Sequence, residues 1–363
     1  FVVAALVAAL SGGAEPGSQP RATPVSVHAV VERSQPVVGP LAVVPWKLVR
    51  DLVREDFEII TDSGSCPIES FSTGDAPITI VVLLDVSASA EIDVDWLIEP
   101  LQKFLITALK RGDRLSFGRF GGTGLHFDGH FLGDRRELLS AARDVLARRA
   151  RQSSPPPATA PDSANRAFVP VKPDPVIQVE GTNGAFGLGA SPVWDAVDAA
   201  VTALESQTGR RAIILVTDGR STGNVHSLDE TILHAVAADV SVSIVGEAQE
   251  EFIRQSETMV ARVRPAVFLQ SMAGMTGGAY ADVFGPEEKR PGRFNERAVK
   301  EWLGRVLAHL VDDLHNTYTL SFFPSVLDGQ VHGLEVRVKR PGLKVRARRG
   351  YLAPAAGCAS PVH

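Results

Sequence analysis

The chain has 363 residues, 44% of them hydrophobic, which is enough for a globular protein with more than one domain. Lysine and arginine number 37 against 42 aspartates and glutamates, so the formal net charge is −5. This balance lacks the basic signature of proteins that bind nucleic acid or an anionic membrane, and we expect neither as a partner. The sequence contains two cysteines, Cys66 and Cys358, and leaves open whether they form a disulfide or remain thiols.

Residues 1–10 form an uninterrupted apolar run, and small residues follow at 11–14. Ten residues are too few to span a bilayer, and the pattern is typical of the hydrophobic core and cleavage region of a secretory signal. We therefore expect residues 1–24 to be a signal remnant with a flexible tail. The mature chain should be exported, as a secreted, periplasmic or cell-envelope protein without an integral membrane segment.

The next segment, residues 25–76, has the alternation of β structure. Residues 25–31 predict one strand, and residues 56–60 and 66–71 predict a β-hairpin around a five-residue loop at 61–65. The stretch at 40–54 is long enough for a short helix.

Between residues 77 and 315, strands and helices alternate along the chain. Uninterrupted apolar runs at 79–84 and 211–216 are typical of strands buried on both faces of a parallel sheet. Further strands are predicted at 113–120, 125–131 (an antiparallel edge strand) and 240–245, and helices at 96–109, 135–149, 227–238 and 297–314. This alternation predicts an α/β fold with a doubly wound, mostly parallel, Rossmann-like sheet.

A proline-rich stretch at about 152–180 interrupts this pattern. It holds too few apolar residues in amphipathic order to offset the entropy of ordering it, so we expect a mobile insertion. It could screen a neighbouring site, although a passive surface loop is the simpler interpretation.

Three oxygen-bearing side chains follow the first buried strand, namely Asp85, Ser87 and Ser89. Ligands of open α/β sheets collect at the carboxyl ends of the strands, and carboxylate and hydroxyl oxygens suit Mg²⁺ better than Zn²⁺ or copper. A simpler alternative is that Asp85 caps the next helix while the serines satisfy turn amides.

The sequence Asp85-Val86-Ser87-Ala88-Ser89 resembles the DxSxS signature of the von Willebrand factor A (VWA) domain family. Residues 187–197 resemble the family's Gly-Gly-Thr-Ala-Leu-Tyr-Asp-Ala loop, with Ser191 at the threonine position, and Thr217-Asp218-Gly219 resembles its third metal loop. The resemblance implies a metal-ion-dependent adhesion site. Its ligands to Mg²⁺ (or Mn²⁺) would be Asp85, Ser87, Ser89, Ser191 and Asp218, and a partner protein would add an Asp or Glu carboxylate.

Two departures from the family pattern concern the site itself. Ser191 lacks the methyl group that makes a threonine rigid, and Ala90 stands where methionine is usual. Ser191 could also serve as a helix N-cap, alone or together with metal binding.

The flanking segments resemble those of a bacterial, secreted VWA subfamily. Residues 318–324 predict a strand, and residues 334–339 and 344–348 predict a hairpin around Pro341-Gly342. Together with residues 25–76, residues 316–352 should form an accessory β module, followed by a tail at 353–363. The period-two spacing of its basic residues predicts that they form the solvated face of the hairpin.

These expectations favour an exported, metal-dependent protein-binding module without enzymatic activity. One alternative is a structural or assembly protein whose metal site is vestigial. A second is a Mg²⁺-dependent phosphohydrolase of the haloacid dehalogenase type, but its chemistry needs a carboxylate two residues after Asp85, where Ser87 stands.

Overall fold

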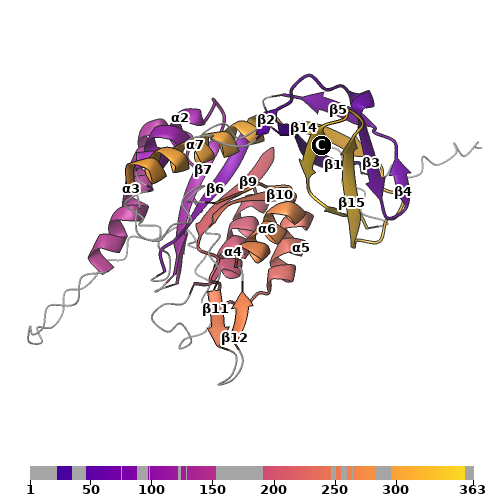
Figure 1. Ribbon diagram of the computed structural model, residues 1–363. Coiled ribbons are helices and arrows are strands. Elements are labelled where there is room, and N and C mark those ends of the chain that lie inside the picture. Colours follow the sequence, from indigo (N-terminus) through magenta and orange to yellow (C-terminus); the bar gives the residue numbers. More distant parts are fainter. Residues whose placement is uncertain are drawn as a thin grey trace, which may run out of the picture.

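The computed structural model describes residues 23–34, 46–74, 76–87, 97, 99–121, 124–127, 129–152, 191–246, 251–254, 260–263, 265–282 and 296–355. The expectations about the first 22 residues, Ser89, the proline-rich insertion after Gln152 and Cys358 lie outside these residues. The described part has a mixed α/β architecture built around a six-stranded sheet, with two larger antiparallel sheets and one two-stranded antiparallel sheet besides it (Figure 1).

The six-stranded sheet has the order β13-β10-β9-β6-β7-β8. Its strands are β6 (Ile78–Asp85), β7 (Arg114–Phe120), β8 (Leu125–Phe127), β9 (Arg210–Thr217), β10 (Val240–Gly246) and β13 (Tyr280–Asp282). All neighbours pair in parallel except β7 and β8, which confirms the mostly parallel sheet and its antiparallel edge strand. Strand order reverses between β6 and β9, so these two strands flank the switch point where α/β proteins bind ligands.

The helices pack on the sheet through two separate apolar clusters. Val81 and Leu83 of β6 belong to the cluster of α4 (Val193–Glu205), α5 (Leu228–Ala237) and α6 (Pro265–Thr276). Ile80, Val82 and Leu84 belong to the other cluster, and the helical segments on that side are η2 (Leu101–Leu105, a π-helical turn), α2 (Ile106–Ala108), α3 (Arg135–Gln152) and α7 (Glu296–His315). Burial of each aliphatic side chain stabilises the fold by about 1.5–3 kcal/mol. Because successive side chains of β6 point to opposite faces of the sheet, they enter the two clusters in turn.

Each of the two larger antiparallel sheets contains strands from both the N-terminal and the C-terminal segment of the chain. One sheet contains β1 (Val25–Ser34), β2 (Trp46–Leu48), β5 (Ser70–Thr73), β14 (Tyr318–Phe322) and β16 (Leu343–Ala347). The other contains β3 (Phe57–Thr61), β4 (Gly64–Cys66), β15 (Val331–Val338) and β17 (Gly350–Leu352). Residues of both sheets share one apolar cluster, in which the rings of Phe57 and Tyr318 lie 5.1 Å apart.

The two predicted hairpins were only partly right. β3 pairs with β4 around a two-residue turn, because Thr61 lies opposite Gly64, and the rest of the predicted second strand became β5 in the other sheet. The predicted C-terminal hairpin is wrong, since β15 pairs with β3 whereas β16 pairs with β1. Alternation along a strand predicts its buried face but does not name its partner, and here two facing sheets divide consecutive strands between them.

Two further elements differ from the sequence-based expectation. Of the stretch at 40–54, which is long enough for a short helix, the structure describes residues 46–54, and these contain β2 and the first residue of a 3₁₀ turn, η1 (Arg54–Asp56). The sequence analysis also missed the antiparallel pair β11 (Glu251–Arg254) and β12 (Val260–Val263).

The prediction of a solvated basic face was wrong for two of its residues. Arg337, Lys339 and Lys344 are exposed, as expected. In contrast, the Arg348 side chain is 8% exposed and Arg346 is 19% exposed, and both form ion pairs. The physical reason is that β16 lies against the α/β sheet, so its polar face is an internal surface rather than a wet one.

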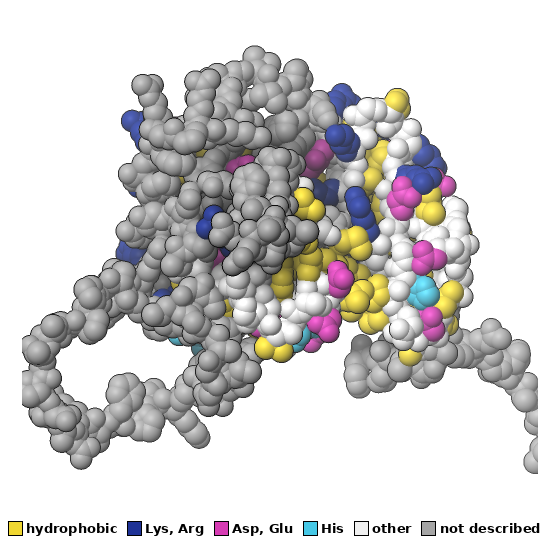
Figure 2. Space-filling view, turned by 60° about the horizontal axis from the view of Figure 1, so that its bottom comes forward, with side chains coloured by type: hydrophobic (Ala, Val, Ile, Leu, Met, Phe, Trp, Pro, Cys, Tyr) yellow, Lys and Arg dark blue, Asp and Glu magenta, His cyan; other side chains and the backbone are white. Residues whose placement is uncertain are grey.

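Hydrophobic, basic and acidic side chains all contribute to the described surface. Figure 2 shows hydrophobic side chains next to both basic and acidic ones on the face turned forward. The exposed large apolar side chains include Leu233 of α5 and Val267 and Phe268 of α6. Within the described residues, no helix combines the length and the apolar character that crossing a membrane requires.

Candidate metal site at the switch point

The carboxylates of Asp85 and Asp218 come together where β6 and β9 end. Asp85 is the last residue of β6, and Asp218 follows the last residue of β9. Ser191, which precedes α4, donates its hydroxyl hydrogen to Asp85 Oδ2 at 3.0 Å. The backbone N–H of Ser87 donates to Asp85 Oδ1 at 2.9 Å. Four of the five residues predicted from the sequence therefore lie in one place, and the fifth, Ser89, lies outside the described residues.

All four residues are buried. Ser87 and Ser191 are fully buried, and Asp85 and Asp218 are 4% and 3% exposed. Two neighbouring buried carboxylates repel each other and have lost their hydration, which is costly unless a cation or hydrogen bonds compensate. Such a pair needs compensation from hydrogen bonds or from a cation.

The pKa of Asp85 reflects the cost of burying these carboxylates. Burial raises the pKa of its carboxyl above the ordinary value, and the neighbouring charge of Asp218 acts in the same direction. Hydrogen bonds from Ser87 and Thr217 oppose the shift. A divalent cation would favour the ionised form of both carboxylates, so metal and protons would compete for this site.

Asp218 leaves one oxygen unused. Its Oδ1 accepts a hydrogen bond from the backbone N–H of Arg220 at 2.9 Å. Its Oδ2 is buried and accepts no hydrogen bond from the described residues, while the Arg220 Nε lies 3.8 Å away. A buried carboxylate oxygen normally has a hydrogen-bond partner, so Asp218 Oδ2 is an exception, with the Arg220 guanidinium as its charged neighbour.

Thr217 is a member of the site that the sequence analysis did not single out. Its hydroxyl donates to Asp85 Oδ2 at 2.7 Å and accepts from the backbone N–H of Gly219 at 3.0 Å. The signal was present, because Thr217 precedes Asp218 directly in the third loop, and β6 and β9 are adjacent and parallel. The hydroxyl of Thr217 thus ties the ends of these two strands together.

Because Gly121 has no side chain, the end of β7 can lie directly against Ser87 in the loop that follows β6. Its φ is +114°, and a Cβ built there would lie 2.6 Å from the backbone nitrogen of Ser87. A side chain would displace the Ser87 loop, and most residues avoid this φ in any case. Gly121 directly follows the predicted strand at 113–120.

The loop after β9 is fastened to the start of α4, so Ser191 and Asp218 are held together. The Ser191 N–H donates to Thr222 Oγ1 at 3.0 Å, and the Thr222 N–H donates to the Ser191 carbonyl at 2.8 Å. Asn224 Oδ1 accepts from the N–H of Trp194 at 2.8 Å. Asn224 thereby satisfies a donor in the first turn of α4, and the Ser191 hydroxyl remains directed at Asp85 rather than acting as a cap.

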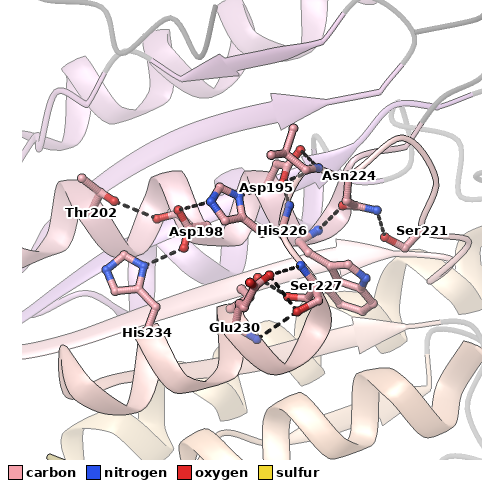
Figure 3. A network of polar contacts seen from close by, with 12 residues as sticks. Asp195, Asp198, Thr202, Ser221, Asn224, His226, Ser227, Glu230 and His234 are labelled. Carbon is pink, nitrogen blue, oxygen red and sulfur yellow. Dashed lines mark hydrogen bonds and ion pairs between the residues drawn. The ribbon is translucent and has the colours of Figure 1, made fainter. Parts of the chain in front are cut away.

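Asp195 completes this attachment (Figure 3). Its carboxylate accepts from the backbone N–H groups of Val225 and His226 at 2.8–3.1 Å, and His226 Nδ1 lies 2.9 Å from Oδ1. A carboxylate in the first turn of a helix also interacts favourably with the helix dipole. Asp195, Thr222 and Asn224 are therefore positioning residues. Local sequence patterns did not predict this role, because their partners are backbone groups of another loop.

The polar network continues along α4 and α5, away from the strand ends. His234 Nδ1 lies 2.6 Å from Asp198 Oδ1, and its Nε2 lies 3.2 Å from Glu205 Oε1. Burial acts to lower the pKa of His234, but Asp198 and Glu205 outweigh it and raise the pKa above its ordinary value. Among the described residues, no group of three or more His, Cys, Asp or Glu side chains has an arrangement that could hold a metal ion. A metal at the switch point would thus depend on hydroxyl groups and water besides its two carboxylates.

Comparison with known proteins gives no family assignment. No protein-family model matches the sequence, and no curated protein matches it either. Among solved structures, the chain is similar to the conserved hypothetical protein BatB from Bacteroides thetaiotaomicron, with a TM-score of 0.35 and 15% identity over 64% of this chain and 99% of that one.

Two further solved structures are similar to the same extent. One is an aerotolerance-related membrane protein from Bacteroides fragilis, with a TM-score of 0.34 and 16% identity over 65% of this chain and 98% of that one. The other is the SpRpn10 VWA domain, with a TM-score of 0.36 and 11% identity over 63% of this chain and 94% of that one. TM-scores of this size assign neither a family nor a function to the chain.

Proposed function

We propose that the chain is an exported, VWA-type protein-binding module that uses a divalent cation at the switch point to capture a carboxylate of a partner protein. The observation that carries the proposal is the pairing of Asp85 with Asp218, in which the buried Asp218 Oδ2 has no hydrogen-bond donor among the described residues. In this proposal the six-stranded sheet is a doubly wound VWA domain, and the two antiparallel sheets form its accessory β module.

The residues present fit Mg²⁺ or Mn²⁺. Asp85, Ser87, Ser191 and Asp218 offer carboxylate and hydroxyl oxygens, which are the ligands these ions prefer, and Ser89 would add another hydroxyl. The bound cation would supply an electrophilic centre that attracts an outside anion. The chain itself would hold and orient that cation through the Ser191 and Thr217 hydrogen bonds to Asp85.

The class of partner follows from the charge of such a site. Two protein carboxylates only just balance one divalent cation, and Mg²⁺ ordinarily has six oxygen ligands, several of them water. An Asp or Glu side chain of another protein could replace a water and would bind without chemical change. The proposal therefore assigns the site to recognition and not to turnover.

A second candidate is a structural or assembly protein whose site no longer binds metal. One specific observation favours it: Asp85 Oδ2 already accepts two hydroxyl hydrogens, from Ser191 and Thr217. The Arg220 guanidinium near Asp218 could also take the place of a metal. A phosphohydrolase is disfavoured, since the fully buried Ser87 stands where the acid/base carboxylate would be needed.

The proposal is tested by titrating Mg²⁺ and Mn²⁺ into the chelator-treated protein, with calorimetry as the readout. The wild type should bind one ion, and Asp218→Asn should bind none. Asn can still accept the Arg220 hydrogen bond, so this variant should fold as well as the wild type. Asp198→Asn is the matched control, because Asp198 pairs with His234 away from the strand ends and should not alter the titration.

The proposed binding of a partner protein is tested by capture from cell-envelope extract, first in Mg²⁺ and then in EDTA. Capture that requires Mg²⁺ and is lost in Asp218→Asn supports adhesion through the metal. Equal calorimetric heats for the wild type and Asp218→Asn, or capture that persists in EDTA, would replace the first candidate by the second.

A further inference from the structure

A buried ionic cluster lies where β1 and β16 meet α7. Arg346 of β16 donates through one atom, Nη2, both to Glu32 Oε1 of β1 at 2.7 Å and to Asp313 Oδ2 of α7. The side chains of Arg346, Glu32 and Asp313 are 19%, 13% and 3% exposed. Arg346 and Asp313 also line a cavity of about 40 Å³, which is large enough for water beside this cluster.

One guanidinium group serves two carboxylates in the cluster. With both carboxylates ionised, the three side chains hold two negative charges and one positive charge, whereas uptake of one proton makes them neutral together. Asp313 Oδ1 is buried and accepts no hydrogen bond from the described residues, although His309 Nε2 lies 3.2 Å away. Because a buried carboxylate with incomplete compensation is costly, the geometry favours the protonated cluster.

The other charged groups of α7 do not supply a second cation. Burial and the charge of Arg346 lower the pKa of His309, so its imidazole is neutral near pH 7. Asp312 adds negative charge and acts to raise the pKa of Asp313 further. Its own partner is Arg50, in an exposed ion pair.

The remaining charged groups that line the cavity have partners of their own. Arg348 and His28 both lie within ion-pair distance of Asp239, at 3.2 and 3.5 Å. Arg211 acts on the pKa values of Asp239 and Arg348, and Arg210 donates to backbone carbonyls. The charge balance of Glu32 and Asp313 therefore depends on Arg346.

The pKa values of the two carboxyls have the direction that this balance requires. Burial raises the pKa of Asp313 from 3.8 to about 6, although Arg346 opposes the shift. Burial also raises the pKa of Glu32, and the neighbouring charge of Asp313 acts in the same direction. Since the two groups are coupled through Arg346, the proton belongs to the pair.

We propose that the cluster is a pH-sensitive switch in the contact between β16 and the α/β domain, closed when the cluster holds one proton and weakened when both carboxylates are ionised. The backbone junction beside it consists of a hydrogen bond from the Arg349 N–H to the Met275 carbonyl at 2.9 Å and a β-bridge between Arg348 and Thr276. Ionisation of the cluster should let this junction open more often. The switch shares no residue with the site at the switch point and does not depend on a metal there.

The test measures hydrogen exchange of the Arg349 amide by NMR at about pH 5 and about pH 7.5, in EDTA to exclude any effect of metal. After correction for the intrinsic exchange rate, protection of this amide should fall about tenfold over that range. The reason is that opening returns the pKa of Asp313 from about 6 to 3.8, so the contribution to stability is present at low pH and is lost as the pH rises through 6. The amide of Ile214, in the middle of β9, reports global unfolding and should stay better protected than that of Arg349.

Two variants and one control assign the effect to the cluster. Asp313→Asn cannot ionise, so it should lose most of the tenfold change and keep high protection at pH 7.5. Glu32→Gln leaves Arg346 to Asp313 alone and should also reduce the change, which keeps the test decisive if Asp313→Asn does not fold. Glu301→Gln, which alters an exposed pair with Arg297 on the same helix, should behave like the wild type.

Three results would overturn the proposal. They are a pH-independent protection of Arg349 in the wild type, an unchanged tenfold fall in both cluster variants, and equal protection of the Arg349 and Ile214 amides at both pH values. The last result would mean that the junction opens only when the whole protein unfolds.

Discussion

The two edges of the six-stranded sheet differ in the charged side chains that they bring together. At the carboxyl edge, Asp85 and Asp218 lie among hydroxyl groups, and one carboxylate oxygen has no hydrogen bond from the described residues. At the amino edge, Arg210 and Arg211 begin β9 and face Arg346 and Arg348. The first edge brings carboxylates and hydroxyl groups together, and the second brings together arginines that pair with Glu32, Asp239 and Asp313.

The difference follows the direction of the chain in a parallel α/β sheet. In such a sheet the helices begin near the carboxyl ends of the strands, where unpaired N–H groups and the helix dipole favour carboxylates such as Asp195 in α4. Helix C-termini lie at the other edge, where exposed carbonyls favour cations. Arg210 donates to the carbonyl of Leu314 at the end of α7 at 2.8 Å and to that of Thr317 at 3.2 Å. The fold therefore sorts the charges of its two edges before any ligand is considered.

The comparison also separates function from structure. The arginines of the amino edge connect segments distant in the sequence, since Arg348 contacts Val236, Ser26 and Asp239. The carboxyl edge connects loops of the same sheet, and Asp218 Oδ2 there accepts no hydrogen bond from the described residues. Loss of an arginine at the amino edge should consequently cost stability, whereas loss of a carboxylate at the carboxyl edge should cost binding in the proposed function.

The largest expected effect is that of Arg348→Ala. The side chain is 8% exposed, and its removal leaves the Val236 and Ser26 carbonyls without this donor and takes a charge away from Asp239. Breaking a buried ion pair from one side costs about 3–5 kcal/mol. Denaturant-induced unfolding should show this loss in the free energy of unfolding.

The matched control for that experiment is Arg337→Ala. Arg337 pairs with Glu335 on the exposed face of β15, and exposed pairs often contribute nothing measurable. Equal stabilities for Arg348→Ala and Arg337→Ala would show that the amino edge is not a structural ion-pair cluster.

The second prediction concerns the pH dependence of the same edge. Burial raises the pKa of Asp313 from 3.8 to about 6, although Arg346 opposes the shift. Because the folded-state pKa lies above the unfolded value, the contribution of Asp313 to stability is complete below about pH 4 and is lost as the pH rises through 6. Asp313→Asn resembles the protonated form, so it should gain about 2–3 kcal/mol relative to the wild type between pH 4 and pH 7.

Other groups at this interface titrate in the same range and must be held constant. Burial also raises the pKa of Glu32 on β1, so its contribution runs in the same direction as that of Asp313. Burial and the charge of Arg346 lower the pKa of His309, whose contribution is present above pH 6.5 and is lost as the pH falls. Both groups remain in Asp313→Asn and in the control Asp312→Asn. Parallel pH profiles for wild type and Asp313→Asn would contradict the prediction, and Asp312→Asn should run parallel to the wild type.

The carboxyl edge could be predicted from the sequence because its chemistry follows the strands directly. An apolar run that ends in Asp85 and another that ends before Asp218 place both carboxylates at one edge of any parallel sheet that contains the two strands. Ser191 was found through its loop motif. Thr222, Asn224 and Asp195 were not found, because they act on backbone groups of a different loop and no local pattern reveals that contact.

The amino edge could not be predicted, and the attempt gave the opposite answer for Arg346 and Arg348. Period-two spacing distinguishes the two faces of a strand but does not say whether the polar face meets water or another part of the chain. Here that face meets Asp313 of α7 and Asp239, which precedes β10. The same limit explains why β15 and β16 were predicted to pair, although they belong to different sheets.

The smallest expected effect concerns Arg220, a cation that lies at the carboxyl edge among the carboxylates. Its Nε lies 3.8 Å from the Asp218 oxygen that accepts no hydrogen bond from the described residues, and its side chain is 34% exposed. A guanidinium so placed competes with a metal ion for the same oxygen, but solvent screens it. Arg220→Gln should therefore tighten Mg²⁺ binding by only about two- to fivefold in calorimetric titration. Arg297→Gln, which alters an exposed pair with Glu301, should leave the Mg²⁺ affinity unchanged. Weaker Mg²⁺ binding in Arg220→Gln would mean that the arginine supports the site instead of competing for it, and the carboxyl edge would then no longer be the purely cation-binding counterpart of the arginine-rich edge.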